Sequence, residues 1–470
     1  MERPVHARLL LAAAAASGAL VLIAHGANLR YLARQLGCES ALLLCPTEVG
    51  PWATGDLKTY HRVAHEIDER GLLGASYLRR SPGYPLVLLL SERLTGHVSP
   101  VRLLGPPLAA LGAGAVAWLA GTLSGRIGPA LLAGPLLCLW FGAYRYTAGM
   151  GPDGMHAFLA VAALAFSVGW RRSERALLGG AAGVLWVVVQ SLRPTFFALP
   201  AILPALLFRR RASARYVRTS LLLWLATFAV PALLVTSNRV HHGIAVPSQI
   251  LANNLACYSV SRLEHERGRG DFDALRWGCI EHFQRMEPRE RIPGQMAYAR
   301  RVLLAKPSQA LLSFTSEILS QLIHPLEIWD VAKRKELYPD WATAGPGWLV
   351  LFWGCAAGGT LILARRDPGL ATFLGLAWLL VMLPASTSHF AGDRLRFPLD
   401  LLFMPVALAF LASLAAPLRW LPEPFKVLRP RPRSAAPRAG GRRARGAGPP
   451  GAPGPSAPGR ASRSRSGRPA

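Results

Sequence analysis

The segment TGDLKTYHRVAHEIDERG contains an acidic residue that could act as a base. Asp56 precedes a stretch in which Tyr60 and several apolar residues recur at helical spacing, and Gly71 follows it. This pattern predicts a short helix that begins near Asp56 and ends at Gly71. Thr54 or Asp56 could cap that helix, which is a common use of such side chains. The Asp56 carboxylate could instead take a proton from an acceptor hydroxyl as a general base.

Two histidines on the same expected helix could bind a metal ion. His61 and His65 are four residues apart and therefore share one helical face. With Asp56 they form a weak candidate set for a divalent cation, because no clear third ligand is evident. A solvated helix face is the alternative, so the cofactor stays unassigned.

The elements around these residues have the composition of a membrane protein. Of 470 residues, 51% are hydrophobic and 17% are charged. About ten apolar segments approach the ~20 residues that cross a bilayer. We therefore predict an all-α integral membrane protein, a polytopic bundle of about ten transmembrane helices whose first helix is not a cleaved signal peptide. The segments are residues 8–27, 99–123, 128–144, 155–170, 176–192, 195–208, 219–236, 346–364, 370–386 and 399–417.

The net charge of +27 suggests a nucleic-acid binder at first, but its placement favours a membrane protein. If the segments alternate in direction, most arginine clusters fall on one side, which the positive-inside rule makes cytoplasmic. Residues 421–470 are rich in Pro, Arg, Gly and Ser, and they have too few apolar residues to build a core. We predict a disordered cytoplasmic tail there, after a membrane domain over residues 1–420, with both termini cytoplasmic and no specific nucleic-acid partner.

This topology places two long loops outside, at about residues 28–98 and 237–345. Four of the six cysteines lie in these loops, which suits disulfides in an oxidising compartment. Pairing within each loop would join Cys38 to Cys45 and Cys257 to Cys279. Residues 295–326 have apolar residues at helical spacing and predict one or two amphipathic helices, broken near Pro307, either at the membrane interface or packed within the loop.

The stretch RRSPGYPLVLLL, residues 79–90, ends the first outer loop. Its apolar run is too short to cross a membrane, so we expect an interfacial or re-entrant piece. Its two prolines fix the backbone direction, and Gly83 would allow a tight turn. Such a piece could aim Arg79 or Arg80 at a phosphate group.

Further ionisable residues lie at the outer ends of apolar segments, where charge facing lipid is costly and therefore indicates function. They are Asp153, Arg193, Arg394 and Arg396. Guanidinium groups match phosphate oxygens in geometry. For Arg396 the alternative to phosphate binding is a purely structural salt bridge with Asp393.

These motifs, in this order, resemble the integral-membrane GT-C glycosyltransferases, specifically the bacterial relatives of dolichyl-phosphate-mannose protein mannosyltransferases and of aminoarabinose transferases. The resemblance covers about residues 8–417. Its elements are Asp56 with Tyr60, the phrase RSPGYP at residues 80–85 (with Ser81 where the usual phrase has proline), Asp153 at the start of a span, LRPT with Arg193, Asn238-Arg239 with Gly243, Asn254-Leu255, and RLRFP with Arg394 and Arg396.

The resemblance implies a GT-C-type fold and an inverting transfer from a polyprenyl-phosphate-linked sugar to an acceptor hydroxyl. Asp56 would be the base, and Asp153 would position the acceptor or share a divalent ion with Asp56. The residues implied for substrate or lipid-phosphate binding are Arg79, Arg80, Tyr84, Arg193, Arg394 and Arg396. The acceptor would be a cell-envelope glycan, lipid or protein, at the outer face of a bacterial inner or plasma membrane.

Two other functions fit a chain of this kind. A lipid or glycolipid transporter or flippase would also have about ten spans, but it is expected to carry charges at mid-membrane and often an internal repeat. An inactive GT-C-like scaffold is the other possibility, against which the presence of Asp56 argues.

Overall fold

The computed structural model describes residues 4–35, 56–148, 151–209, 212–323, 347–387 and 393–415. All of them belong to one unit of the chain, Met1–Pro422. The predicted Cys38–Cys45 pairing and the predicted disordered tail at 421–470 lie outside the described residues.

The described residues form helices and no strands, which confirms the all-α prediction. In chain order the elements are α1 (Pro4–Gln35), α2 (Leu57–Arg70), α3 (Gly83–Thr95), η1 (Ser99–Leu104), α4 (Gly105–Ser124), α5 (Ile127–Leu139), α6 (Phe141–Ala148), α7 (Pro152–Ser173), α8 (Ala176–Leu192), η2 (Pro194–Phe196), α9 (Leu199–Leu207), α10 (Ala214–Ala226), α11 (Ala229–His242), α12 (Ile250–Asn253), the π-helix η3 (Asn254–Ser259), α13 (Val260–Glu266), α14 (Phe272–Gln284), α15 (Pro288–Ala305), α16 (Pro307–Ile323), α19 (Gly347–Arg366), α20 (Pro368–Ala385) and α21 (Asp393–Leu414).

Within the described ranges, seven helices are long and apolar enough to cross a membrane, as in a multi-pass membrane protein. They are His6–Tyr31, Ser99–Ser124, Pro152–Ser173, Ala214–His242, Gly347–Arg366, Pro368–Ala385 and Leu395–Leu414. The apolar helices α5 and α8 are shorter, and α9 has only 9 residues. The predicted number of about ten spans is therefore not confirmed, because three of the expected segments form helices that are too short by themselves.

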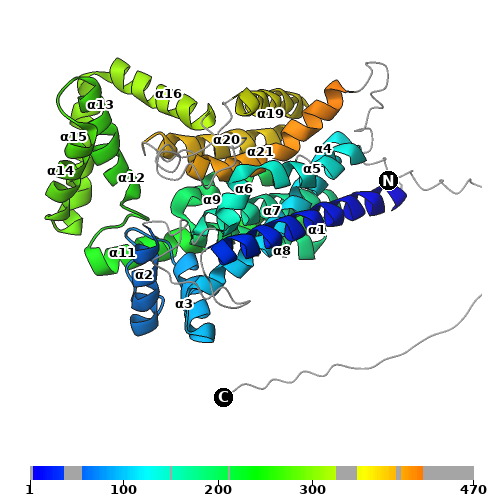
Figure 1. The fold of residues 1–470 in the computed structure, drawn as a ribbon, viewed down its shortest axis with the longest axis horizontal. Coiled ribbons are helices and arrows are strands. Elements are labelled where there is room, and N and C mark those ends of the chain that lie inside the picture. The colour runs from blue at the N-terminus through cyan, green and yellow to red at the C-terminus, as the bar shows by residue number, and fades with distance from the viewer. Residues whose placement is uncertain are drawn as a thin grey trace, which may run out of the picture. The chain divides into compact units, whose positions relative to one another are not determined.

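The bundle is built around α4 and α7, which pack against each other (Figure 1). Helix α4 also contacts α1, α5 and α21. Its small residues Ala109, Gly112 and Ala113 are buried, and Gly112 lies against Phe158 of α7. Small side chains let neighbouring helix backbones approach closely, which is how membrane helices associate without a strong hydrophobic driving force. Most of α7 is buried, so the residues in its first turn are held by the centre of the fold.

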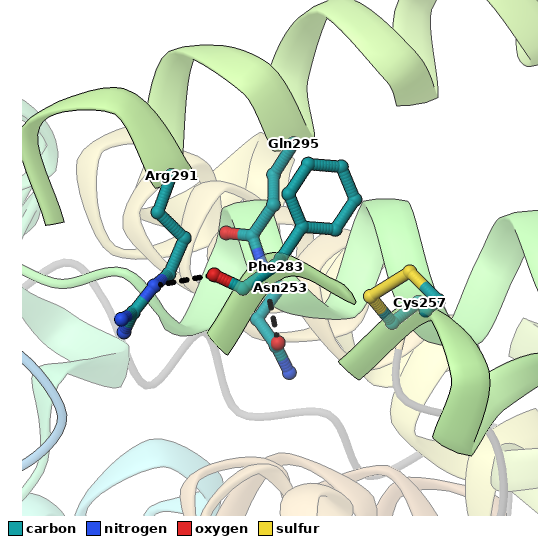
Figure 2. Close-up of a disulfide and its surroundings, with 6 residues drawn as sticks. Asn253, Cys257, Phe283, Arg291 and Gln295 are labelled. Atoms are coloured by element: carbon teal, nitrogen blue, oxygen red, sulfur yellow. Dashed lines mark hydrogen bonds between the residues drawn. A yellow bond between two sulfur atoms is a disulfide. The ribbon is translucent and has the colours of Figure 1, made fainter. Parts of the chain in front are cut away.

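Helices α2 and α3, from the first predicted outer loop, and α12–α15, from the second, lie toward one end of this bundle, at the left and lower left of Figure 1. There α12–α15 and η3 pack around a small core that includes Cys257, Phe283 and Ala299. A disulfide joins Cys257 to Cys279, which confirms the pairing expected in the second loop (Figure 2). Helix α15 ends at Ala305 and α16 begins at Pro307, so the predicted break is also present.

Helix α3 shows why the RSPGYP phrase contains glycine. Gly83 begins a helix, and its backbone is not in the left-handed region. A Cβ atom on Gly83 would lie 2.3 Å from Ser191 Oγ and 2.7 Å from the Ser191 carbonyl carbon at the end of α8. The expectation that Gly83 serves a tight turn was therefore wrong, since the close approach of α3 to α8 is what requires a glycine.

Candidate functional site

Asp56 lies at the start of α2, but its side chain does not cap the helix. The carboxylate instead forms an ion pair with Arg80, 24 residues later, in the segment that leads into α3. Both side chains are only partly exposed, at 30% for Asp56 and 16% for Arg80. The site thus brings together the expected base and one of the two candidate phosphate ligands.

A buried tyrosine, Tyr60, packs against this ion pair, and a second one, Tyr84, packs against Tyr60. The Arg80 guanidinium carbon lies 4.9 Å from the centre of the Tyr60 ring, a cation–π distance. The rings of Tyr60 and Tyr84 meet edge to face with centroids 5.1 Å apart. Tyr84 was expected near the substrate, and the structure places it directly behind Tyr60.

A second acid–arginine pair comes from α7 and α8. Asp153, in the first turn of α7, pairs with Arg193, the residue that ends α8. This pair is more deeply buried, with exposures of 2% for Asp153 and 12% for Arg193. A buried carboxylate needs such a cation because removal of a charge from water is costly.

The two ion pairs act on the same phenol. Burial raises the pKa of Tyr60, and the positive charges of Arg80 and Arg193 partly oppose this rise while Asp153 and Asp56 add to it. Residues from motifs up to 137 positions apart in the sequence thus lie close enough to Tyr60 to influence its pKa.

Arg79 points to a different place from its neighbour Arg80. It lines a polar pocket of about 410 Å³ between α2 and the helices α11, α14 and α15, together with Arg62, Glu66, His242 and Arg291. Burial lowers the pKa of Arg79, and the nearby guanidinium groups of Arg291, Arg62 and Arg80 lower it further. Three arginines against one glutamate make this pocket suitable for an anion, and its volume suits a small ligand.

Arg291 is fixed at the pocket wall by backbone contacts. Its Nε donates to the Phe283 carbonyl at 2.9 Å (Figure 2). One Nη donates to the carbonyls of Gln284 and Met286. In the same view Gln295 donates to Asn253, which ties α15 to α12. The contacts of Arg291 hold the start of α15 against the end of α14, and these two helix ends supply Gln284, Pro288 and Arg291 to the pocket lining.

Arg394 and Arg396 behave differently from the other expected phosphate ligands. The side chain of Arg394 lies outside the described part of the chain, as does that of Asp393. Arg396 is buried, pairs with Asp400 at 3.0 Å and donates to the Gln321 carbonyl at 2.6 Å. The contact with Gln321 joins α21 to α16, and the buried pair with Asp400 occupies the guanidinium inside the bundle. The expected pairing with Asp393 stays a prediction, because the Asp393 side chain lies outside the described part of the chain.

The chain matches no protein-family model and no curated protein sequence.

Reasoning from sequence missed two buried polar residues beside the site. Arg102 in η1 is 4% exposed, and neither its Nε nor its Nη2 has a hydrogen-bond partner among the described residues. The Tyr84 hydroxyl, whose pKa burial raises and Arg102 lowers, is equally unsatisfied there. Buried donors without a partner are costly, so these atoms are available to bind a polar group. The sequence feature that could have indicated Arg102 is its position as a lone arginine in the first turns of an apolar segment.

His156 is the second missed residue. It lies one turn after Asp153 on α7, is fully buried and packs beside Phe196 with ring centroids 5.3 Å apart. Neither ring nitrogen has a hydrogen-bond partner among the residues that the structure describes. Its spacing of three residues from Asp153 could have placed it on the same helical face.

Proposed function

We propose that the chain is a membrane glycosyltransferase that moves a sugar from a polyprenyl-phosphate-linked donor to an acceptor hydroxyl. The observation that carries the proposal is the convergence of two acid–arginine pairs, Asp56–Arg80 and Asp153–Arg193, on Tyr60. A carboxylate can accept the acceptor proton, and a guanidinium can hold a phosphate leaving group.

In this mechanism the acceptor oxygen bonds to the anomeric carbon of the sugar while the bond from that carbon to the phosphate oxygen breaks. The acceptor proton passes to the Asp56 carboxylate, and the electron pair of the broken bond leaves with the polyprenyl phosphate. A single displacement inverts the anomeric configuration. Arg80 supports both charges, since it contacts Asp56 and could turn part of its guanidinium to the departing phosphate.

The polar pocket around Arg79, called the cationic pocket from here on because three arginines line it, supports the choice of an anionic substrate. Arg79 and Arg291 line a space that adjoins the Asp56 pair through the Arg79–Arg80 peptide. The unsatisfied donors of Arg102 add a third cation near Tyr84. Asp153 would orient the acceptor rather than take its proton, because its carboxylate is buried against Arg193.

The seven apolar helices support a location in a membrane, which we propose to be a bacterial inner or plasma membrane. The site would face the outer side, where cell-envelope glycans, lipids or proteins supply acceptor hydroxyls. A divalent cation is not needed for the proposed displacement, because arginines provide the positive charge.

The decisive variant is Asp56→Asn, which keeps the size of the side chain but removes the base. We expect normal expression and membrane insertion with loss of the glycan product, measured by mass spectrometry of cell-envelope glycans in a complemented deletion strain. The matched control is Asp68→Asn, on the same helix, because Asp68 also pairs with an arginine, Arg93, but lies at the exposed end. Full activity of Asp56→Asn would refute the assignment of the base.

The same strain separates the enzyme from a transporter or a scaffold. A deletion that changes no glycan would argue against a transferase. A deletion that leaves the donor lipid on the inner side of the membrane would instead support a flippase.

A further inference from the structure

The structure brings a third ligand to the two histidines of α2. His61 and His65 stack edge to face with ring centroids 4.4 Å apart. Glu92, on α3, places its Oε2 3.2 Å from the His61 Nε2. One ligand atom from each of the three side chains lies within 4.8 Å of the other two. Sequence spacing alone could not reveal Glu92, which is 27 residues from His65.

The donor set determines which ion would fit. Two imidazole nitrogens and one carboxylate oxygen form a common zinc coordination set, whereas calcium and magnesium prefer oxygen ligands. In a tetrahedral zinc site with bonds of about 2.0 Å, the ligand atoms are about 3.3 Å apart. Small rotations of these partly exposed side chains would bring them to that distance, and a water could complete the coordination.

A simple hydrogen bond between His61 and Glu92 is the competing explanation for two of the three residues. It does not account for His65, which makes no hydrogen bond with a described residue yet stacks on the His61 ring. Asp56, the other weak metal candidate from the sequence, is not part of this group, since its carboxylate faces Arg80.

We propose that His61, His65 and Glu92 bind a zinc-class divalent ion that joins α2 to α3. These two helices carry the residues of the site, because Asp56 and Tyr60 belong to the start of α2, and Tyr84 belongs to the start of α3. The ion would fix the relative position of the helices without touching the reacting atoms. This proposal stands independently of the proposed glycosyl transfer.

The test uses the full-length chain in detergent, purified with a tag that contains no histidine. Zn²⁺ is titrated calorimetrically into metal-stripped protein, with Mg²⁺ as the comparison ion. We expect one Zn²⁺ per chain for the wild type, and a dissociation constant raised at least about tenfold in His65→Ala and in Glu92→Gln, since even outer-shell partners are worth that much. His97→Ala is the matched control, because His97 is an exposed histidine just after α3 and outside the group.

A second measurement does not depend on the folding of any variant. Wild-type protein is treated with a histidine-modifying reagent with and without Zn²⁺, and the modified residues are located by mass spectrometry. The proposal expects Zn²⁺ to protect His61 and His65 but not His97. Equal modification of all three histidines in the presence of Zn²⁺ would overturn the proposal. Unchanged zinc affinity in both His65→Ala and Glu92→Gln would also overturn it.

Discussion

Replacement of Arg193 by methionine removes the positive member of the buried pair with Asp153. Methionine preserves much of the length of the side chain, so the loss of charge dominates the effect. The exposures of 12% for Arg193 and 2% for Asp153 place the pair among buried ion pairs. Removal of one member of such a pair costs about 3–5 kcal/mol, whereas an exposed pair contributes about 0–1 kcal/mol. Because Asp153 keeps its other interactions, we expect about 3 kcal/mol, the lower end of that range.

A double-mutant cycle isolates the interaction itself. Free energies of unfolding are measured in mixed detergent micelles for Asp153→Asn, Arg193→Met and the double variant. We expect a coupling energy of about 2 kcal/mol, since contacting residues in one ion pair do not behave additively. The reference cycle uses Asp68 and Arg93, whose side chains are 38% and 66% exposed and should couple by less than about 0.5 kcal/mol. If the two cycles gave equal coupling, or if Arg193→Met lay within about 1 kcal/mol of wild type, the pair would not be buried as described.

Three further predictions follow from the packing. Gly83→Ala should lower the free energy of unfolding by about 1–3 kcal/mol, because the new methyl group on α3 would meet Ser191 on α8. Gly180→Ala on α8 is the control, since its Cβ would enter open space and the change should be neutral or slightly stabilising. Thermal unfolding compares the two variants. Cys257→Ala should cost about 3 kcal/mol, as expected for a disulfide that closes a loop with a sequence separation of 22, and limited proteolysis should then cleave the second outer segment faster. The free energy of unfolding should fall as the pH rises above 10.0, because tyrosines in the unfolded chain then lose their protons while the raised pKa of Tyr60 keeps its phenol protonated in the fold. Tyr60→Phe should reduce this fall. An unchanged slope between pH 8 and 11 in that variant would contradict the stated burial of the phenol.

The positions of the helices could be read from the sequence because apolar runs and end signals act locally. Gly71 ends α2 with a positive φ of 73°, and Pro307 starts α16, both as the spacing indicates. The number of spans could not be obtained in this way. Helix α9 begins only after the break at Pro194, so a run of suitable composition yields only a short helix. Whether it reaches across a membrane depends on its neighbours, which composition does not describe.

The candidate site could be proposed from the sequence as a set of residues, but the contacts between those residues could not. The motifs indicated Asp56 and Arg80, yet their ion pair depends on how the segment before α3 returns to α2. Arg396 shows the opposite case. Asp400 follows it by four residues on the same apolar helix, a local signal of an ion pair that the motif-based interpretation did not use, and the structure contains that pair.

Arg79 and Arg80 point to different places, so the segment before α3 fixes the distance between two binding positions. Consecutive Cα atoms are about 3.8 Å apart, so one peptide unit and two side chains set the span between the cationic pocket and the Asp56 carboxylate. A substrate could satisfy both positions only if its charged group and its reacting atom were separated by a matching length. Insertion of a single residue between the two arginines would change that length without removing any functional group. If the chain is the proposed transferase, the insertion would therefore alter the selection of substrates rather than the chemistry.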